Sequence, residues 1–327
     1  MPHRFNLRRL TLAALWATAA VSTMSITPAL AQNQPIKILV GFPAGGSADL
    51  SARVIADKMK DTLGVPVIVE NRPGAGGRIA AQAVRDAAAD GNTLMLAPFA
   101  VMVVQPVVFK SVKYDTTKDF TPMGNVVTFP LALAAGPATP AKNMAELVTW
   151  LKANPAQANY GSPAAGSLPH FLGEMLAANA GVKLTHVPFQ GGAPMVQNLL
   201  GGQIPIAFDT PAEFAEQHRA GKLRVLAMSG SARSAQFPEV PTMKEQGLNL
   251  EANAWFALFG PANIPAATTQ RISGALQAAL KQPDVAERLQ KLGLTAAPGT
   301  ADEMTKRLAA DKAAWEPIIK NTGFQAD

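Results

Sequence analysis

Short runs of Val, Ile and Leu alternate with segments of helical periodicity along most of the chain. The first apolar run, 36–42, precedes a segment whose apolar residues recur every three or four positions, at Ala48, Ala52, Ile55, Met59 and Leu63. Such spacing predicts a helix with one buried face. The alternation continues with strands at 65–70 and 93–98 and a helix at 78–89. It predicts an α/β protein built from βαβ units.

An extended apolar stretch at 121–137 interrupts this alternation, which then resumes. A second extended stretch, 252–261, precedes a final region with an almost entirely helical pattern. Two such stretches predict two lobes, each a mostly parallel sheet flanked by helices. We expect a first lobe of 32–131 plus 252–327 and a second lobe of 132–251, with crossovers near 128–136 and 248–256.

Several predicted helices begin at side chains that can bind free backbone N–H groups. Asn143 precedes Glu146 by three positions, and Thr precedes Glu by the same spacing at 210–213, 242–245 and 300–303. A Thr at the helix start with a Glu three residues later forms a capping box. We therefore predict a helix beginning at each of these four positions.

The first 31 residues have the layout of a secretory signal peptide. Arg4, Arg8 and Arg9 precede an apolar segment, and Ala29 and Ala31 occupy the small-residue positions of a cleavage site. Cleavage is expected after Ala31, which yields a soluble exported protein. The two adjacent arginines leave both the general secretory and the twin-arginine export routes open.

Removing this leader changes the charge of the chain. Without the three leader arginines, 26 of the 29 basic residues remain against 23 acidic ones, a net charge of +3 in place of +6. The remaining basic residues form no stripe, so nucleic-acid binding is not supported. The absence of cysteine excludes disulfides, thiolate metal sites and a cysteine nucleophile. Beyond the leader, no apolar run is long enough to span a bilayer.

Four glycine-rich loops follow predicted strands, at 41–47, 71–77, 162–167 and 189–192. Each loop has two interpretations, a tight turn between strand and helix or a binding site. In open α/β sheets, ligands bind beyond the carboxyl ends of strands, where the N–H groups of helix starts attract anions. Glycine lets ligand atoms approach the backbone because it lacks a Cβ. Four such loops divided between two lobes favour anion binding.

More specific glycine motifs fail at particular residues. Ser47 stands where a phosphate-binding P-loop needs lysine, and Ile79 replaces the third glycine of a dinucleotide fingerprint. Asp49 replaces the last glycine of the G-x-S-x-G elbow of hydrolases. Asp49 itself has two interpretations, a first-turn acid paired with Arg53 or a ligand contact. The motifs therefore predict no cofactor.

The histidines beyond the leader are His170, His186 and His218, and their spacing matches no metal site. His186 lies in a predicted strand and is interpreted as a core or edge residue. His170 falls in the first helical turn after the third glycine-rich loop, from which it could reach a ligand. An exported hydrolase using Ser47 or Ser162 with His170 is an alternative, but it lacks a nucleophile motif. We expect a binding protein and no enzyme.

Several segments closely resemble the solute receptors of tripartite tricarboxylate transporters, also called the Bug family: 38–59, 65–77, 88–98, 159–176, 184–209, 221–233 and 237–247. The resemblance covers essentially all of the chain beyond the leader. It implies a monomeric, two-lobed periplasmic binding protein of type II topology that closes on a small carboxylate. It also implies delivery of the ligand to a membrane permease with a large and a small subunit. A ligand sensor for a membrane signalling partner would use the same fold and stays open.

The resemblance also implies where the ligand binds. One carboxylate is expected on the loop 42–49, held mainly by backbone N–H groups, beside Ala97 and Pro98. The other end is expected at the loops 162–167 and 189–192 and at 209–210. With His170 added for its position, the expected ligand-binding residues are Phe42, Pro43, Ala44, Gly45, Gly46, Ser47, Asp49, Ala97, Pro98, Ser162, Gly166, Ser167, His170, Phe189, Gln190, Gly191, Asp209 and Thr210.

The sequence departs from the family pattern at two loops. Phe189 stands where the family often has tyrosine, so a hydroxyl donor is missing. The loop at 162–166 reads Ser-Pro-Ala-Ala-Gly, which is stiffer and bulkier than the usual pattern. Both changes make the expected pocket less polar. They favour an aromatic or otherwise less polar carboxylate over a small hydroxylated diacid.

Overall fold

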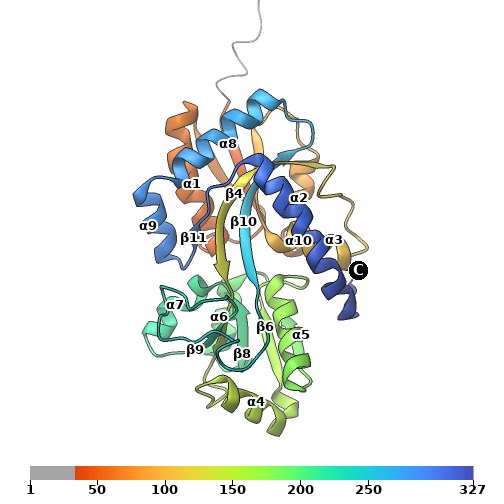
Figure 1. Ribbon diagram of the computed structural model, residues 1–327, viewed down its shortest axis with the longest axis vertical. Coiled ribbons are helices and arrows are strands. Elements are labelled where there is room, and N and C mark those ends of the chain that lie inside the picture. The colour runs from red at the N-terminus through yellow and green to blue at the C-terminus, as the bar shows by residue number, and fades with distance from the viewer. Residues whose placement is uncertain (1–33, 327) are drawn as a thin grey trace, which may run out of the picture. The chain divides into compact units, whose positions relative to one another are not determined.

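The computed structural model describes residues 34–326, so the predicted signal peptide lies outside the described residues. Two β-sheets organise residues 35–326, and helices pack beside each sheet (Figure 1). The α/β class predicted from the alternating pattern is confirmed. Both sheets contain parallel strands joined by helices, as expected for βαβ units.

The first sheet contains six strands in the order β11-β4-β10-β3-β1-β2. They are β1 (Ile36–Val40), β2 (Val67–Asn71), β3 (Thr93–Pro98), β4 (Phe120–Pro130), β10 (Asn253–Pro261) and β11 (Thr295–Ala296). β1 pairs in parallel with β2 and β3, whereas β10 is antiparallel to β3 and β4. The sheet is mixed because β10 and β11 run opposite to the other four strands. β4 leads toward the second sheet, and β10 returns from it.

The second sheet contains five strands in the order β7-β6-β8-β5-β9. They are β5 (Ala132–Ala135), β6 (Asn159–Ser162), β7 (Thr185–Pro188), β8 (Ile206–Asp209) and β9 (Arg224–Met228). β6 is parallel to β7 and β8, whereas β5 is antiparallel to β8 and β9. Only Leu131 separates β4 from β5, so one extended segment contributes to both sheets.

The helices lie between these strands along the chain. They are α1 (Ser47–Leu63), α2 (Arg78–Arg85), α3 (Gln105–Val108), α4 (Met144–Ala153), α5 (Leu168–Ala180), α6 (Gly192–Leu200), α7 (Pro211–Arg219), α8 (Ala266–Leu280), α9 (Pro283–Lys291) and α10 (Ala301–Asn321). In Figure 1, α4 to α7 lie with the second sheet and the other helices with the first. Within residues 34–326, no helix is both long enough and apolar enough to cross a membrane.

The predicted apolar stripe of α1 is buried. Ala52, Ile55 and Met59 are fully inaccessible to solvent, because this face of the helix packs in the hydrophobic core. The helix ends at Gly64, whose φ of +69° suits a residue without a Cβ. Burial of this face holds α1 in place, and its first turn follows the loop that leaves β1.

Trp255 fixes β10 within the core of the first sheet. Its side chain is fully buried, and its indole Nε1 donates to Asp311 Oδ2 of α10 at 2.7 Å. The ring of Phe99, just after β3, contacts Trp255 edge-on with a centroid distance of 5.6 Å. A buried tryptophan with its N–H satisfied gives both packing and orientation. The ends of β3 and β10 are thereby held together.

The predicted caps at Asn143 and Thr300 are confirmed. Asn143 accepts a hydrogen bond from Glu146 N at the start of α4, at 2.9 Å. Thr300 and Glu303 exchange both bonds of a capping box at the start of α10.

The prediction of a helix beginning at Thr242 is wrong. Thr242 and Glu245 do exchange capping-box hydrogen bonds, but the segment makes only a turn. Met243 N donates to Met228 O, which ties the segment to β9, and Gly247 adopts a φ of +82°. The spacing of Thr242 and Glu245 predicted their hydrogen bonds correctly. No helix follows, because the backbone after Thr242 hydrogen-bonds to β9 instead.

Candidate functional site

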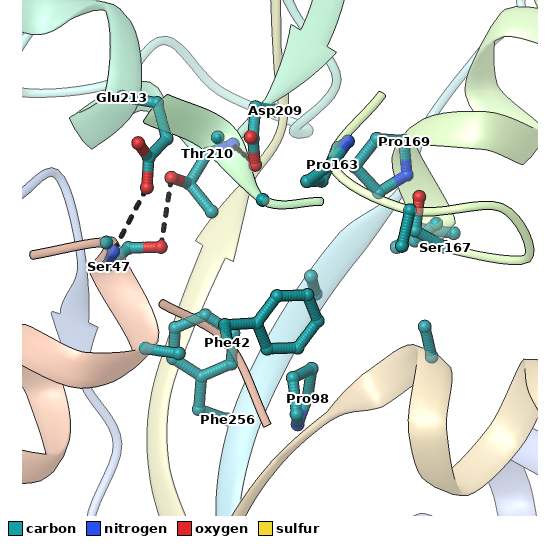
Figure 2. A pocket seen from close by; sticks show the side chains of 18 of the residues that line it. Phe42, Ser47, Pro98, Pro163, Ser167, Pro169, Asp209, Thr210, Glu213 and Phe256 are labelled. Carbon is teal, nitrogen blue, oxygen red and sulfur yellow. Dashed lines mark hydrogen bonds between the residues drawn. The ribbon is translucent and has the colours of Figure 1, made fainter. Parts of the chain in front are cut away.

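A cavity of about 100 Å³ lies where the segments after β1, β3, β6, β7 and β8 converge (Figure 2). These segments belong to both sheets and leave the carboxyl ends of strands, where open α/β sheets bind ligands. Phe129 of β4 and Phe256 of β10 form another part of the wall, with ring centroids 4.7 Å apart. Since one water needs roughly 10–15 Å³, the cavity has room for a small organic molecule.

Most of the cavity wall is apolar. Phe42, Pro98 and Phe256 lie side by side in the lower wall of the view in Figure 2. Among the described residues that line the cavity, Asp209 and Glu213 are acidic, and none is a lysine, arginine or histidine. An anion bound here would therefore be held by N–H and hydroxyl groups rather than by basic side chains.

The loop between β1 and α1 is braced by Asp49. Gly45 adopts a φ of +87°, and its N–H donates to Asp49 Oδ2 at 2.9 Å. Arg53 donates to the same carboxylate at 3.0 Å, and Asn71 Nδ2 donates to Oδ1 at 2.9 Å. Burial alone would raise the pKa of Asp49, but these hydrogen bonds outweigh it and lower the pKa. Asp49 does not line the cavity, and its contacts are those of a first-turn acid paired with Arg53.

A carboxylate already occupies the start of α1. Ser47 N donates to Glu213 Oε1 at 3.0 Å, across the interval between the two sheets (Figure 2). Thr210 Oγ1 donates to Ser47 Oγ at 3.3 Å beside it. A Cβ on Gly46 would lie 3.5 Å from Glu213 Oε1, and one on Gly192 would lie 2.5 Å from Glu213 Oε2. These two glycines thus leave the room that the carboxylate of Glu213 occupies.

Glu213 was assigned from sequence only as part of a capping box at the start of α7. α7 does begin at Pro211, but Thr210 makes no side-chain cap, so that box is not formed. The carboxylate of Glu213 instead turns to Ser47, 166 positions earlier in the chain. A partner so distant in sequence gives no local signal.

Asp209 is more deeply buried than Glu213. Its side chain is 4% exposed, and Oδ1 accepts from Thr210 N at 2.7 Å. Oδ2 has no hydrogen-bond partner among the described residues. Burial, followed by the negative charge of Glu213, raises the pKa of Asp209 well above its usual value. Burial also raises the pKa of Glu213, although hydrogen bonds from Ser47 oppose the shift.

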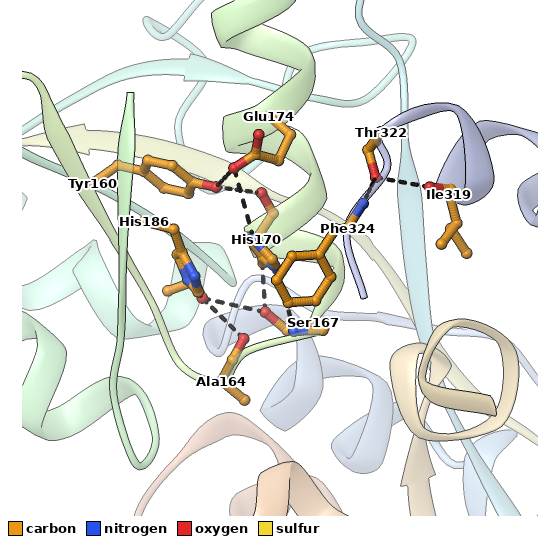
Figure 3. A network of polar contacts seen from close by, with 11 residues as sticks. Tyr160, Ala164, Ser167, His170, Glu174, His186, Ile319, Thr322 and Phe324 are labelled. Atoms are coloured by element: carbon orange, nitrogen blue, oxygen red, sulfur yellow. Dashed lines mark hydrogen bonds and ion pairs between the residues drawn. The ribbon is translucent and has the colours of Figure 1, made fainter. Parts of the chain in front are cut away.

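The loop after β6 is supported by a buried polar network (Figure 3). Ser162 donates to Ala164 O at 3.0 Å, and its Oγ lies 2.7 Å from His186 Nε2. Gly166 N donates to His170 Nδ1 at 3.1 Å, and the two imidazole rings stack with centroids 3.8 Å apart. Burial is the main cause that lowers the pKa of His186 to about 3. This network holds the shape of the loop.

The contact between Ser162 and His186 does not make a nucleophile. The Ser162 hydroxyl hydrogen is used on Ala164 O, so His186 Nε2 carries the proton that Ser162 Oγ accepts. A histidine acting as general base would need the opposite arrangement. Ser162 is also fully buried and does not line the cavity.

The structure places some of the expected ligand-binding residues at the cavity and others away from it. Those that line the cavity are Phe42, Pro43, Ala44, Gly46, Ser47, Pro98, Ser167, Gly191, Asp209 and Thr210. Those that do not line it are Gly45, Asp49, Ala97, Ser162, Gly166, His170 and Phe189. Gln190 lines a smaller neighbouring pocket. Phe189 packs against the hydrophobic cluster of the second sheet, so the apolar wall comes from other residues.

Sequence reasoning missed several residues of the wall. The most informative are Glu213, Gln105, Phe129, Trp255 and Phe256. The three aromatic residues lie on β4 and β10, which were expected only to connect the lobes. Their position in extended segments between the lobes was an available signal, because a crossover necessarily passes beside an interlobe cleft. Gln105, in contrast, lies in an apolar segment with no motif.

Comparison with known proteins gives a consistent assignment. A family model described as tripartite tricarboxylate transporter family receptor matches residues 51–324. A Cupriavidus necator protein, described as "UPF0065 protein in gbd 5'region", is 38% identical over 283 residues, covering 85% of each chain. The structure of the periplasmic binding protein BugD superposes with a TM-score of 0.85 at 30% identity, over 90% of this chain and 99% of that chain.

A second solved structure carries a ligand. MatC (Rpa3494) from Rhodopseudomonas palustris with bound malate superposes with a TM-score of 0.83 at 30% identity, over 87% of this chain and 98% of that chain. The predicted fold class and family are confirmed. The family consists of solute receptors and not of enzymes, which removes the hydrolase alternative. With its matched segment covering most of the sequence, the chain belongs to the receptor family of the tripartite tricarboxylate transporters.

Proposed function

We propose that this receptor captures a small carboxylate in the periplasm by closing two lobes on it. It then delivers the ligand to a tripartite tricarboxylate-type permease with a large and a small membrane subunit. Family membership supports this function, as does the malate bound to MatC. The lobes in this proposal comprise 32–131 plus 252–327 and 132–251, with cleavage of the leader after Ala31.

The contact between Ser47 and Glu213 carries the proposal. A backbone N–H at the first turn of α1 holds a carboxylate oxygen at 3.0 Å, which supports this position as the binding site for a carboxylate of the ligand. Among residues 34–326, the starts of α1, α5, α6 and α7 all contribute to the cavity wall. A helix start has N–H groups without intrahelical acceptors and the positive end of a helix dipole. In the ligand complex, the ligand carboxylate replaces Glu213 on Ser47 N.

A binding site of this kind needs lobe closure. A hydrogen bond to a charged group contributes roughly 1.5–3 kcal/mol, and a helix start adds about 0.3–1 kcal/mol. Four such bonds give on the order of 10 kcal/mol before association costs of at least about 4 kcal/mol. Micromolar affinity needs about 8 kcal/mol net. Exclusion of water by closure supplies the difference, with the bending located where β4 passes into β5 and where the chain returns into β10.

The wall favours a ligand with an apolar body. Phe42, Phe129 and Phe256 supply apolar surface that a small hydroxylated diacid would leave unused. A thermal-shift screen of the mature protein tests this preference with benzoates and phenylalkanoates against malate and citrate. We expect stabilisation by the aromatic acids. Stabilisation by malate or citrate alone would overturn the ligand preference, and no response to any carboxylate would overturn the proposed capture of a carboxylate.

Delivery is tested separately from capture. Membranes carrying both permease subunits should accumulate the labelled ligand only when the receptor is added. A pull-down with the ligand-loaded receptor identifies the membrane partner directly. Recovery of a signalling ectodomain in place of the permease would favour the sensor alternative.

A further inference from the structure

The polar groups of the cavity wall are unusual for a site that binds an anion. Asp209 and Glu213 both face the cavity, and the described wall contains no basic side chain to balance them. Figure 2 shows the two carboxylates on the same side of the cavity, Asp209 at the end of β8 and Glu213 in the first turn of α7. Their mutual repulsion raises the pKa of Asp209 beyond the effect of burial.

Two buried acceptors of the wall also lack donors. Asp209 Oδ2 and Gln105 Oε1 have no hydrogen-bond partner among residues 34–326, and their side chains are 4% and 1% exposed. The orientation of Gln105 is fixed because its Nε2 donates to Gly76 O at 2.8 Å. Buried acceptors are nearly always paired, so these two oxygens indicate a missing donor. Both residues line the cavity, one from each side.

Capture of a carboxylate at Ser47 would increase this imbalance. The Ser47 backbone N–H donates to Glu213 Oε1 at 3.0 Å, and the ligand would take that donor. Glu213 would then be a partly buried carboxylate that has lost its backbone donor, beside Asp209 and the carboxylate of the ligand. A ligand that carries only carboxylates offers nothing to offset this, because a carboxylate is an acceptor without donors.

We propose that the ligand carries a protonated nitrogen in addition to its carboxylate, and that Asp209 and Glu213 bind this nitrogen. The ligand class is an amino acid or another amino carboxylate with an apolar body. An ammonium group has three donors and no acceptor, which matches the unpartnered oxygens of the wall. Such a zwitterion also adds no net charge to the cavity. This inference rests on the proposed function and specifies its substrate class.

Matched ligand pairs test the proposal on the mature wild-type protein by calorimetry at pH 7. The pairs are L-phenylalanine with 3-phenylpropionate, L-leucine with 4-methylpentanoate, and 4-(aminomethyl)benzoate with 4-methylbenzoate. In at least one pair, we expect the amine-bearing member to bind tenfold or more tightly than its partner. The inference is overturned if amine-free acids bind equally well or better in every pair, and the proposed function then stands. Absence of binding by every carboxylate tested overturns both.

Two variants assign the preference to the acidic pair. In Glu213→Gln and Asp209→Asn, we expect the affinity ratio within the preferred pair to fall to threefold or less, while the amine-free acid binds at least as well as before. Glu216→Gln is the matched control, because Glu216 lies exposed on the same helix and does not line the cavity. Its ratio should equal that of the wild type. An unchanged ratio in Glu213→Gln, with native thermal unfolding, contradicts the assignment even if Asp209→Asn fails to fold.

Discussion

Gly46→Val is the most direct test of the carboxylate position at the start of α1. Gly46 is the residue before the helix, with φ of −77° and ψ of 167°. Any residue adopts this backbone conformation, so valine introduces no strain. A Cβ at this position would lie 3.5 Å from the carboxylate oxygen now held by Ser47 N. The two methyl groups of valine extend beyond the Cβ and would occupy the place of a bound carboxylate.

The magnitude follows from the interactions removed. Loss of one charge-assisted hydrogen bond costs roughly 1.5–3 kcal/mol, and loss of the helix-start contribution costs about 0.3–1 kcal/mol. The sum, about 2–4 kcal/mol, corresponds to an affinity loss on the order of 30- to 1,000-fold. Calorimetry with a carboxylate from the thermal-shift screen measures this loss. Urea unfolding of the same variant should change by no more than about 1 kcal/mol, because an apolar residue is a poorer helix cap than glycine.

Gly201→Ala is the matched control for this variant. Gly201 follows α6 with φ of −76°, and an added Cβ would lie 3.3 Å from Gln197 O. The tight contact should lower the free energy of unfolding. Affinity should stay unchanged, because Gly201 does not line the cavity. If Gly46→Val binds within threefold of the wild type, the carboxylate does not sit at the start of α1, and our account of the site is incorrect.

Three further predictions concern stability. Burial raises the pKa of Asp209 in the folded state. Above about pH 4 the folded protein therefore binds more protons than the unfolded chain, so the stability that this group contributes falls as pH rises. The unfolding free energy of wild type minus that of Asp209→Asn should therefore decrease between pH 4 and pH 7 in urea titrations, and a constant difference would contradict the pKa shift. Gly124→Ala should destabilise by more than about 2 kcal/mol, since Gly124 has a φ of +149° and its Cβ would collide with Gly299 O. Gly274 lies in the middle of α8, and open space surrounds the position of an added Cβ, so Gly274→Ala should instead stabilise by about 0.5–1 kcal/mol. Equal thermal unfolding of the two glycine variants would contradict both predictions.

The sequence predicted those parts of the fold whose signals are local. The stripe from Ala48 to Leu63 predicted α1, and the Thr300–Glu303 box predicted the start of α10, because both depend on neighbours within one or two turns. The mixed character of both sheets was not predicted, since antiparallel pairing of β10 depends on a partner far away in sequence.

The candidate site was predictable only in part. The loop 42–49 was recognisable because glycine, proline and serine between a strand and a helix have a local meaning. Glu213 was misassigned because its local role as a cap and its observed contact with Ser47 compete for the same carboxylate, and the sequence shows only the first. His170 was expected near the ligand from its place in the first turn of α5, but the stacking against His186 directs it into the network that supports the loop.

The absence of basic side chains from the described cavity wall bears on the environment in which the receptor works. Dissolved ions weaken attraction between exposed charges over about a Debye length. Dipoles buried in a closed cavity are screened far less. The dissociation constant should therefore change little between low and high salt concentrations. In exchange, the cavity provides no long-range electrostatic attraction, so ligand entry should proceed at ordinary diffusive rates.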